Sequence, residues 1–391
     1  MITREELQAR RTVAQEKMQT LNLDGLLLLQ NISMYYFSGT MQCSYVFIPA
    51  AGECLGLVRK NYKRAKLEAG IPVAAIDRFS DVPAKLAEAG FKVKRLGLEM
   101  DVVPVKIYFQ LQKVLPETEF LDAGILVREV RQKKSAFELK QLRLAAKQID
   151  ALHKKIPDLL EIGKKEIVFA AECEAFLRKL GHQGFTRMRG FNEEMYYGHI
   201  LSGAEGAEAS FVDSPTGGKG LSPVMPYGAG EKTLAANEPI TVDYGGIHGG
   251  YVVDQTRLYS FGKLPDLLRR GFEAALEVQE TVKKLLYPGT TGADIFAAAL
   301  ETAKKLGLAE HFMGFGRTQA SFVGHGVGLE VNEFPILAKN SPHIIIEDTV
   351  VAVEPKFTFP GAGVVGLENT WQVTKNGPVK ISLTADEHVI L

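Results

Sequence analysis

The N-terminal part of the chain alternates apolar runs with amphipathic stretches. Residues 24–29, Asp-Gly-Leu-Leu-Leu-Leu, form a dense apolar run that is typical of a buried strand. Residues 43–50 and 53–60 are apolar segments on either side of a short Ala-Gly turn, which predicts a β-hairpin. Residues 97–101 predict a further short strand. These patterns indicate a compact α/β domain, in which we find no cluster of catalytic residue types.

A change of pattern near residues 128–135 predicts a domain boundary. This run is strongly charged, and Ser135 and Glu138 have the spacing of a helix capping box. Apolar positions then recur at helical spacing, and glycine and β-rich segments become frequent further on. We therefore assign residues 1–128 to a first domain and residues 129–391 to a second.

The second domain has the same order of elements twice. Amphipathic helical stretches at 139–156 and 164–180 precede a β-rich segment at 239–260. Helical stretches at 264–286 and 293–306 precede further β-rich segments. This order predicts an α+β domain of two similar halves, although the identity between the halves is too weak to define a sequence repeat.

The composition narrows the class of protein. The 391 residues are too many for one ordinary core, in line with two domains. The formal net charge is zero, so no basic excess indicates a nucleic-acid partner. The N-terminus lacks an apolar signal segment, and no apolar run is long enough to span a membrane. The three cysteines lack metal-binding spacing and indicate free thiols, so we expect a cytoplasmic location.

Residues 239–260 contain the first chemically informative pattern. Asp243 and Asp254 lie on two apolar segments around a glycine-rich turn, and their midpoint falls at His248–Gly249. An antiparallel hairpin centred there places the two carboxylates nearly opposite each other, with Cβ atoms about 5 Å apart. Facing like charges destabilise a sheet, and a buried charge needs a partner. The pair therefore requires a cation or an unusual proton.

Residues 348–374 repeat this arrangement with glutamates. Glu354 and Glu368 lie on two apolar segments, and their midpoint is Gly361, within the turn at 360–363. One such hairpin has ordinary explanations, such as a surface ion-pair site. Two of them in one domain, joined by matching helices, indicate a common site.

His325 is the candidate nitrogen ligand for this site. It stands between Gly324 and Gly326, so the backbone of another segment can approach it closely. A lone buried histidine is usually a hydrogen-bonded structural residue, but here four candidate carboxylate ligands lack a nitrogen partner. These side chains exceed the ligand set of a typical structural zinc site. They suit two divalent ions, Mn²⁺ first and Co²⁺, Zn²⁺ or Fe²⁺ as alternatives, which share a water that becomes the nucleophile.

The order Asp, Asp, His, Glu, Glu resembles that of the pita-bread metallopeptidases, which include prolidase and aminopeptidase P. VDYGGIHGGYVVDQTR at 242–257 is similar to their Asp-x-Gly…Gly-Tyr-x-x-Asp-x-Thr-Arg signature. GHGVGLEVNEFP at 324–335 is similar to their Gly-His-Gly-x-Gly…His-Glu-x-Pro signature. VEPKF and GLENTWQVT resemble the two strands that carry the glutamates. The segment DGLLLLQNISMYYFSG resembles the N-terminal domain of prolidases, so the resemblance extends over the whole chain.

This resemblance implies a C-terminal pita-bread domain behind a creatinase/prolidase-type N-terminal domain, and hydrolysis of short Xaa-Pro peptides. It implies that Asp243 holds one metal ion and that Asp254 and Glu368 bridge both ions. His325 and Glu354 are then expected to complete the second ion, and Glu354 to transfer protons. Because members of the family are commonly dimeric, the resemblance also implies a homodimer.

Several positions outside the ligand set depart from the family pattern. Asn332 stands at the histidine of the His-Glu-x-Pro motif, Ser321 at a second family histidine and Gly366 at an arginine. No histidine occurs from 200 to 247, where the family has a third. We expect Asn332 to donate a hydrogen bond without titrating. His199 either enters the site from another direction or is an ordinary strand residue.

The glycine-rich segment 213–230 precedes the first ligand strand. Its GGKG sequence lacks the spacing and the following helix of a phosphate-binding loop. We interpret the segment as either a lid over the site or a surface excursion.

Three functions are compatible with these patterns. The first is a dinuclear-metal peptidase, either an Xaa-Pro aminopeptidase or an Xaa-Pro dipeptidase. The second is a metal-dependent hydrolase or lyase that acts on a non-peptide substrate, which the replaced histidines leave open. The third is a non-catalytic binding protein, which the intact ligand set and the zero net charge disfavour.

Overall fold

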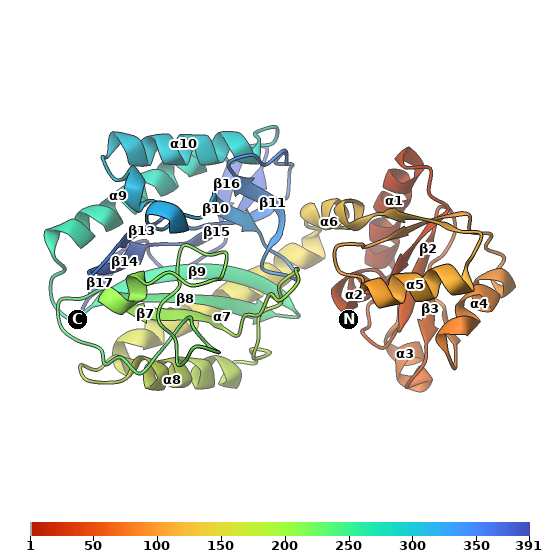
Figure 1. Cartoon of the computed structure of the whole chain (residues 1–391), viewed down its shortest axis with the longest axis horizontal. Helices are drawn as coiled ribbons and strands as arrows, with labels where there is room; N and C mark the ends of the chain where they lie inside the picture. Colours follow the sequence, from red (N-terminus) through yellow and green to blue (C-terminus); the bar gives the residue numbers. More distant parts are fainter. Residues whose placement is uncertain (1) are drawn as a thin grey trace. The chain divides into compact units, whose positions relative to one another are not determined.

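The computed structural model describes residues 2–391, which divide into two compact units. Unit 1 extends to Arg131 and includes Gly190–Asn192, and unit 2 comprises Gln132–Arg189 and Glu193–Leu391. The division after Arg131 falls within the charged run at 128–135 in which the sequence predicts a boundary. Figure 1 shows the elements of each unit, which are described separately below.

Unit 1 is built on a six-stranded mixed sheet of strand order β4-β3-β2-β1-β5-β6. The strands are β1 (Gly25–Leu28), β2 (Tyr45–Pro49), β3 (Leu55–Val58), β4 (Val73–Ala75), β5 (Arg95–Leu98) and β6 (Glu119–Asp122). Its helices are α1 (Arg4–Thr20), α2 (Asn31–Ser38), α3 (Tyr62–Glu68), α4 (Val82–Glu88), α5 (Val105–Val114) and α6 (Gly124–Gln132). The antiparallel pairing of β2 with β3 confirms the predicted hairpin.

Unit 2 contains the helices α7 (Ala136–Leu159), α8 (Glu166–Lys179), α9 (Asp266–Lys283) and α10 (Gly292–Lys305). The Ser135 hydroxyl accepts from the Glu138 N–H, and the Glu138 carboxylate accepts from the Ser135 N–H, so the predicted capping box is confirmed. In Figure 1, α7 and α8 lie along one side of the strands of this unit, and α9 and α10 lie along the other. Unit 2 also contains three short 3₁₀ helices, at Ala204–Ala207, Ala309–His311 and Gly316–Thr318, and a further one, at Phe79–Asp81, lies in unit 1.

The strands of unit 2 form three sheets. The four-stranded sheet has the order β17-β9-β8-β7, with β7 (Gly198–Ser202), β8 (Ile240–His248), β9 (Tyr251–Ser260) and β17 (His388–Ile390). The five-stranded sheet has the order β11-β10-β12-β15-β16, with β10 (Phe322–Gly326), β11 (Glu333–Ala338), β12 (Val350–Val353), β15 (Asn369–Thr374) and β16 (Gly377–Lys380). The remaining pair is β13 (Lys356–Phe359) with β14 (Gly363–Gly366). Helices and sheets are thus mixed in the α+β class that the sequence predicts.

Arg257 connects the strands of unit 2 from inside the core. This side chain on β9 is 2% exposed. Its guanidinium donates hydrogen bonds to six oxygens, namely those of the Thr256, Glu368, Thr384 and Ala385 carbonyls and of the Asn369 and Asp386 side chains. It therefore joins β9 to the start of β15 and to the segment that precedes β17.

Replacement of Arg257 by methionine should destabilise unit 2 by about 3 kcal/mol or more, because several buried oxygens lose their donor at once. The single tryptophan of the chain, Trp371, lies in unit 2 and is a specific fluorescence reporter for urea unfolding. The matched control is Arg269→Met, because the exposed Arg269–Glu273 pair of α9 contributes no more than about 1 kcal/mol. Equal unfolding midpoints for the two variants would contradict the role of Arg257.

Candidate metal centre

The first carboxylate hairpin forms as predicted, but its register differs from the predicted one. Asp243 on β8 faces Thr256, and Asp254 on β9 faces Gly245. The two aspartates, which were predicted to lie nearly opposite each other about 5 Å apart, are therefore offset by two residues across the hairpin. The turn consists of Gly249 and Gly250, both at positive φ, so it is centred later in the chain than the midpoint of the two aspartates. The carboxylates are diagonal neighbours on one face of the sheet, a spacing of roughly 7–8 Å between Cα atoms.

The second hairpin has the predicted register. Val353 pairs with Asn369 and Lys356 pairs with Gly366, and the same register aligns Glu354 with Glu368. Pro355 interrupts the ladder between these pairs because it has no N–H to donate. The strands therefore separate into the β12/β15 and β13/β14 pairs, and the two glutamates lie at the junction.

His325 lies on β10, opposite Ala352 of β12. A Cβ atom at Gly324 would lie 2.3 Å from the Ala352 oxygen, so only glycine allows this approach of the two strands. His325 Nε2 lies 3.3 Å from Glu354 Oε1 and 3.9 Å from Glu368 Oε1. The flanking glycines thus permit the close packing that brings the imidazole to the glutamates.

The structure brings all five predicted ligands together as two overlapping groups. Asp254, His325 and Glu368 each have one ligand atom within 4.8 Å of the others. Asp243, Glu354 and Glu368 meet the same criterion. Glu368 is common to both groups and Asp254 belongs to the first group only, so the bridging roles of these two residues stay predictions.

The first group fits a divalent cation. Glu368 is 1% exposed, and its Oε1 atom accepts no hydrogen bond from any described residue. A buried carboxylate oxygen without a donor is costly unless a cation satisfies it. Two carboxylates and one imidazole are also donors that Mn²⁺, Fe²⁺, Co²⁺ and Zn²⁺ accept.

The second group already contains a cation, the ammonium of Lys356. Its Nζ atom lies 2.7 Å from Asp243 Oδ2, 2.8 Å from Glu354 Oε2 and 3.6 Å from Glu368 Oε2. The Lys356 side chain is 1% exposed, so the ammonium is buried among the carboxylates. The sequence motifs predicted no role for Lys356.

One signal in the sequence points to Lys356, and the structure adds a second. It follows Glu354 by two residues on an extended segment, and such residues share one face of the strand. The arginine of the family pattern is absent at Gly366, which is the direct partner of Lys356 across β13 and β14. A Cβ atom at Gly366 would lie 2.5 Å from the Pro355 oxygen and 2.8 Å from Lys356 Cα and Cγ. Only glycine therefore allows the two strands to approach this closely.

The Lys356 ammonium divides the carboxylates electrostatically. Burial, reinforced by Asp243, raises the pKa of Asp254 to about 7. Burial and the neighbouring Asp254 also raise the pKa of Glu368 well above its usual range. Burial opposes the ionisation of Asp243 and Glu354 too, but Lys356, together with His199 beside Asp243 and His325 beside Glu354, outweighs it and holds the pKa of each carboxyl below its usual value.

His199 reaches the same cluster from β7, where it lies directly opposite Asp243. The ring is buried, and its Nδ1 atom lies 3.1 Å from the Thr216 hydroxyl. Burial lowers the pKa of His199, although the Asp243 carboxylate acts in the opposite sense. Thr216 belongs to the segment 213–230, so part of this segment covers His199. A catalytic role for His199 stays a prediction.

Asn332 makes paired hydrogen bonds to the backbone of Arg189. Its Nδ2 donates to the Arg189 oxygen at 2.8 Å, and its Oδ1 accepts from the Arg189 N–H at 2.8 Å. The carboxamide of Asn332 offers a donor and an acceptor side by side, which an imidazole at this position cannot do. The side chain thus holds the segment around Arg189, and its predicted catalytic role stays a prediction.

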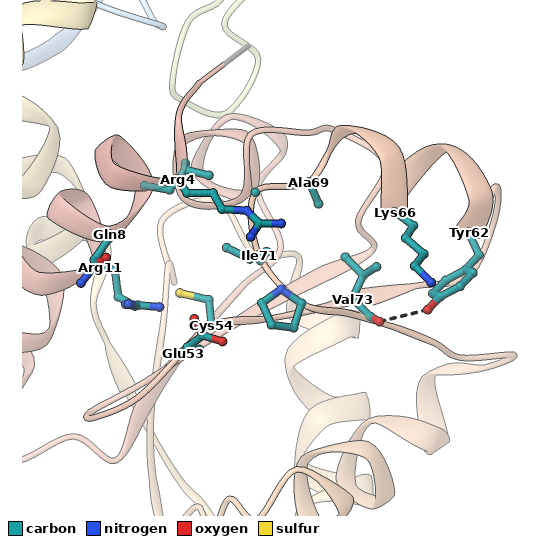
Figure 2. Close-up of a pocket in the computed structure, with 13 residues that line it drawn as sticks. Arg4, Gln8, Arg11, Glu53, Cys54, Tyr62, Lys66, Ala69, Ile71 and Val73 are labelled. Atoms are coloured by element: carbon teal, nitrogen blue, oxygen red, sulfur yellow. Dashed lines mark hydrogen bonds between the residues drawn. The ribbon is translucent and has the colours of Figure 1, made fainter.

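A separate pocket of about 560 Å³ lies in unit 1 (Figure 2). Arg4, Arg11 and Lys66 line it together with Glu53 and Cys54. The Tyr62 hydroxyl at its edge donates to the Val73 oxygen at 3.2 Å. None of the five predicted ligands lines this pocket, so the carboxylate cluster of unit 2 remains the candidate site.

Comparisons with known proteins show what the chain resembles in sequence and fold. The model of metallopeptidase family M24 matches residues 140–375, and that of the creatinase/prolidase N-terminal domain matches residues 10–133. An Xaa-Pro dipeptidase of Pyrococcus horikoshii is 27% identical over 376 residues, 95% of this chain and 96% of that protein.

Two solved structures extend the comparison. An Xaa-Pro dipeptidase from Bacillus anthracis has a TM-score of 0.83 at 26% identity, over 98% of this chain and 100% of that one. An X-Pro aminopeptidase from Thermotoga maritima shares the fold, with a TM-score of 0.78 at 22% identity over 96% and 100% of the two chains. Both span this chain nearly from end to end.

Substitution of Asp254 by asparagine should abolish tight binding of Mn²⁺, because the group of Asp254, His325 and Glu368 loses a charged donor. We expect the affinity, measured by isothermal titration calorimetry, to fall by more than the roughly 10–100-fold typical of an outer-shell partner. Asp158→Asn, which removes an exposed carboxylate of α7, should leave the affinity unchanged. Unaltered Mn²⁺ binding by the Asp254 variant would show that the ion is held elsewhere.

Proposed function

The chain belongs to metallopeptidase family M24, and on this premise we propose that it is a divalent-metal-dependent peptidase that cleaves short Xaa-Pro peptides. The observation that carries the proposal is the convergence of Asp243, Asp254, His325, Glu354 and Glu368 on one cluster. The names of the relatives from Pyrococcus horikoshii and Bacillus anthracis, both Xaa-Pro dipeptidases, support the substrate class. Their identities of 27% and 26% leave the choice between dipeptidase and aminopeptidase to experiment.

A bound divalent ion supplies two effects in such a site, polarisation of the scissile carbonyl and activation of water at neutral pH. The residues of the chain supply the rest. Glu354 is held ionised by Lys356, and its Oε1 atom faces His325, so this oxygen can accept a proton from the attacking water. Lys356 keeps that carboxylate in place through its bond to Oε2. His199, neutral and opposite Asp243, borders the cluster on the side of β7.

The identity of the metal and the setting of the protein are parts of the same proposal. We propose Mn²⁺ as the native ion, with Co²⁺, Zn²⁺ or Fe²⁺ as alternatives, because carboxylate oxygens dominate the donor set. Among the described residues, no helix combines the length and apolar character needed to cross a bilayer. The homodimer and the cytoplasmic location stay predictions.

A metal-dependent reaction on a non-peptide substrate is the second candidate. The observation in its favour is that Asn332, which stands at a family histidine, makes its paired bonds with the Arg189 backbone. Loss of one donor to the reacting group typically costs roughly 10²–10³ in rate. A chain in which the histidine donors of the family pattern are replaced suits a reaction whose leaving group is not the amine of a peptide bond.

A peptidase assay with purified, Mn²⁺-loaded protein tests the first candidate. We expect release of proline from Xaa-Pro dipeptides, or of the first residue from longer Xaa-Pro-Yaa peptides, and slower cleavage of matched peptides without proline. The length series distinguishes a dipeptidase from an aminopeptidase. Binding of Mn²⁺ without cleavage of any peptide would reject the peptidase and favour the non-peptide reaction.

The variant Glu354→Gln assigns any activity to this site. It keeps the shape of the side chain but removes the proton acceptor, so kcat/KM should fall by about 100-fold or more. Glu347→Gln, which alters an exposed glutamate of the same segment, is the matched control and should retain full activity. If the two variants hydrolyse peptides equally fast, Glu354 has no role in proton transfer.

A further inference from the structure

Lys356 lies where a second metal ion of the predicted pair would have to lie. Its ammonium contacts Asp243 and Glu354 at 2.7 and 2.8 Å and approaches Glu368 at 3.6 Å. These three carboxylates are the ones that form the second candidate metal group. A transition-metal ion bound to the same oxygens would lie about 2.0–2.2 Å from them. The ammonium and such an ion therefore compete for one place.

The backbone fixes the direction of the Lys356 side chain. Lys356 begins β13 and pairs with Gly366 of β14, and its carbonyl oxygen accepts from the Met313 N–H at 2.8 Å. It shares its face of the extended segment with Glu354, which points into the cluster. The glycine at 366 allows β14 to lie against the backbone of Pro355 and Lys356 and against Lys356 Cγ, where a Cβ atom would be only 2.5–2.8 Å away.

The group of Asp254, His325 and Glu368 contains no such ammonium. Glu368 Oε1 accepts no hydrogen bond from the residues that the structure describes, and it faces His325 Nε2 at 3.9 Å. Asp254 completes this group. One half of the cluster thus contains a fixed cation, and the other half has an unsatisfied buried acceptor that a single ion would satisfy.

We propose that Lys356 replaces one ion of the metal pair, so that the protein holds a single divalent ion on Asp254, His325 and Glu368. Asp243 then functions as an ion-pair partner of Lys356 and not as a metal ligand. The inference rests on the proposed function only in taking the cluster to be a metal site. The number of ions can be measured whether or not a peptide is cleaved.

Metal counting with the full-length protein tests this inference. After equilibration with excess Mn²⁺ and removal of free ion, elemental analysis should give one ion per chain. Electron paramagnetic resonance should show the six-line spectrum of isolated Mn²⁺, without the spin coupling expected of two ions roughly 3.5–4 Å apart. Two ions per chain, or none, would overturn the inference.

Variants at position 356 test the reason for the single ion. Lys356→Met fills the space without a charge, and Lys356→Gly opens it, so both should raise the Mn²⁺ content towards two ions per chain. Lys356→Arg retains a cation and should remain at one. The matched control is Lys134→Met, which removes the other buried lysine of an ion pair, with Glu333 at 3.0 Å, and should leave the content at one.

The outcomes separate the two proposals. A content of one ion in the methionine and glycine variants would show that Lys356 does not block a second ion, and would reject the inference. If these variants fail to fold, the count in the unaltered protein and in Lys356→Arg still decides. A protein that binds one Mn²⁺ ion but cleaves no peptide contradicts the proposed peptidase and leaves this inference intact.

Discussion

Four carboxylates that converge from different sheets impose the main constraint on unit 2, because Asp254, Glu354 and Glu368 are buried, Asp243 is partly buried, and each needs a cation or a proton. The cluster meets this requirement unevenly. Lys356 forms short ion pairs with Asp243 and Glu354, whereas it lies 3.6 Å from Glu368 Oε2, and the Glu368 Oε1 atom accepts no hydrogen bond from the described residues. The β-hairpins, the glycines beside His325 and the Arg257 network serve to hold these charges at fixed distances. The same contacts therefore stabilise the fold and position the charged groups of the metal site.

The sequence predicted the ligands better than their pairing. The midpoint of Glu354 and Glu368 gave the correct register because the turn at 360–363 is symmetric about Gly361. The same argument failed for Asp243 and Asp254, because the conformation of Gly249 and Gly250 places the turn after the midpoint. The midpoint argument assumes that the turn lies halfway between the two carboxylates. The actual position of the turn is set by the glycines that adopt positive φ. The alternation of faces still placed both aspartates on one side of the sheet.

Contacts between distant segments could not be predicted from spacing. The carboxamide of Asn332 pairs with the backbone of Arg189, far away in sequence, a contact that the motif did not indicate. Lys356 is part of the VEPKF motif, but the position of its side chain depends on its cross-strand neighbour, Gly366. The chain lacks an arginine at Gly366 and carries a lysine directly opposite. From this position the Lys356 ammonium enters the carboxylate cluster.

The position of Lys356 inside the cluster changes what membership of the family implies for this chain. The ligand types favour a metal, but the positive charge among the ligands determines how many ions fit. Anomalous diffraction at the manganese edge, from crystals equilibrated with Mn²⁺, measures this directly. We expect one peak per chain, among Asp254, His325 and Glu368, with the Lys356 ammonium still bonded to Asp243. Two peaks within the cluster, with Lys356 displaced from Asp243 and Glu354, would contradict the replacement of a metal ion by Lys356.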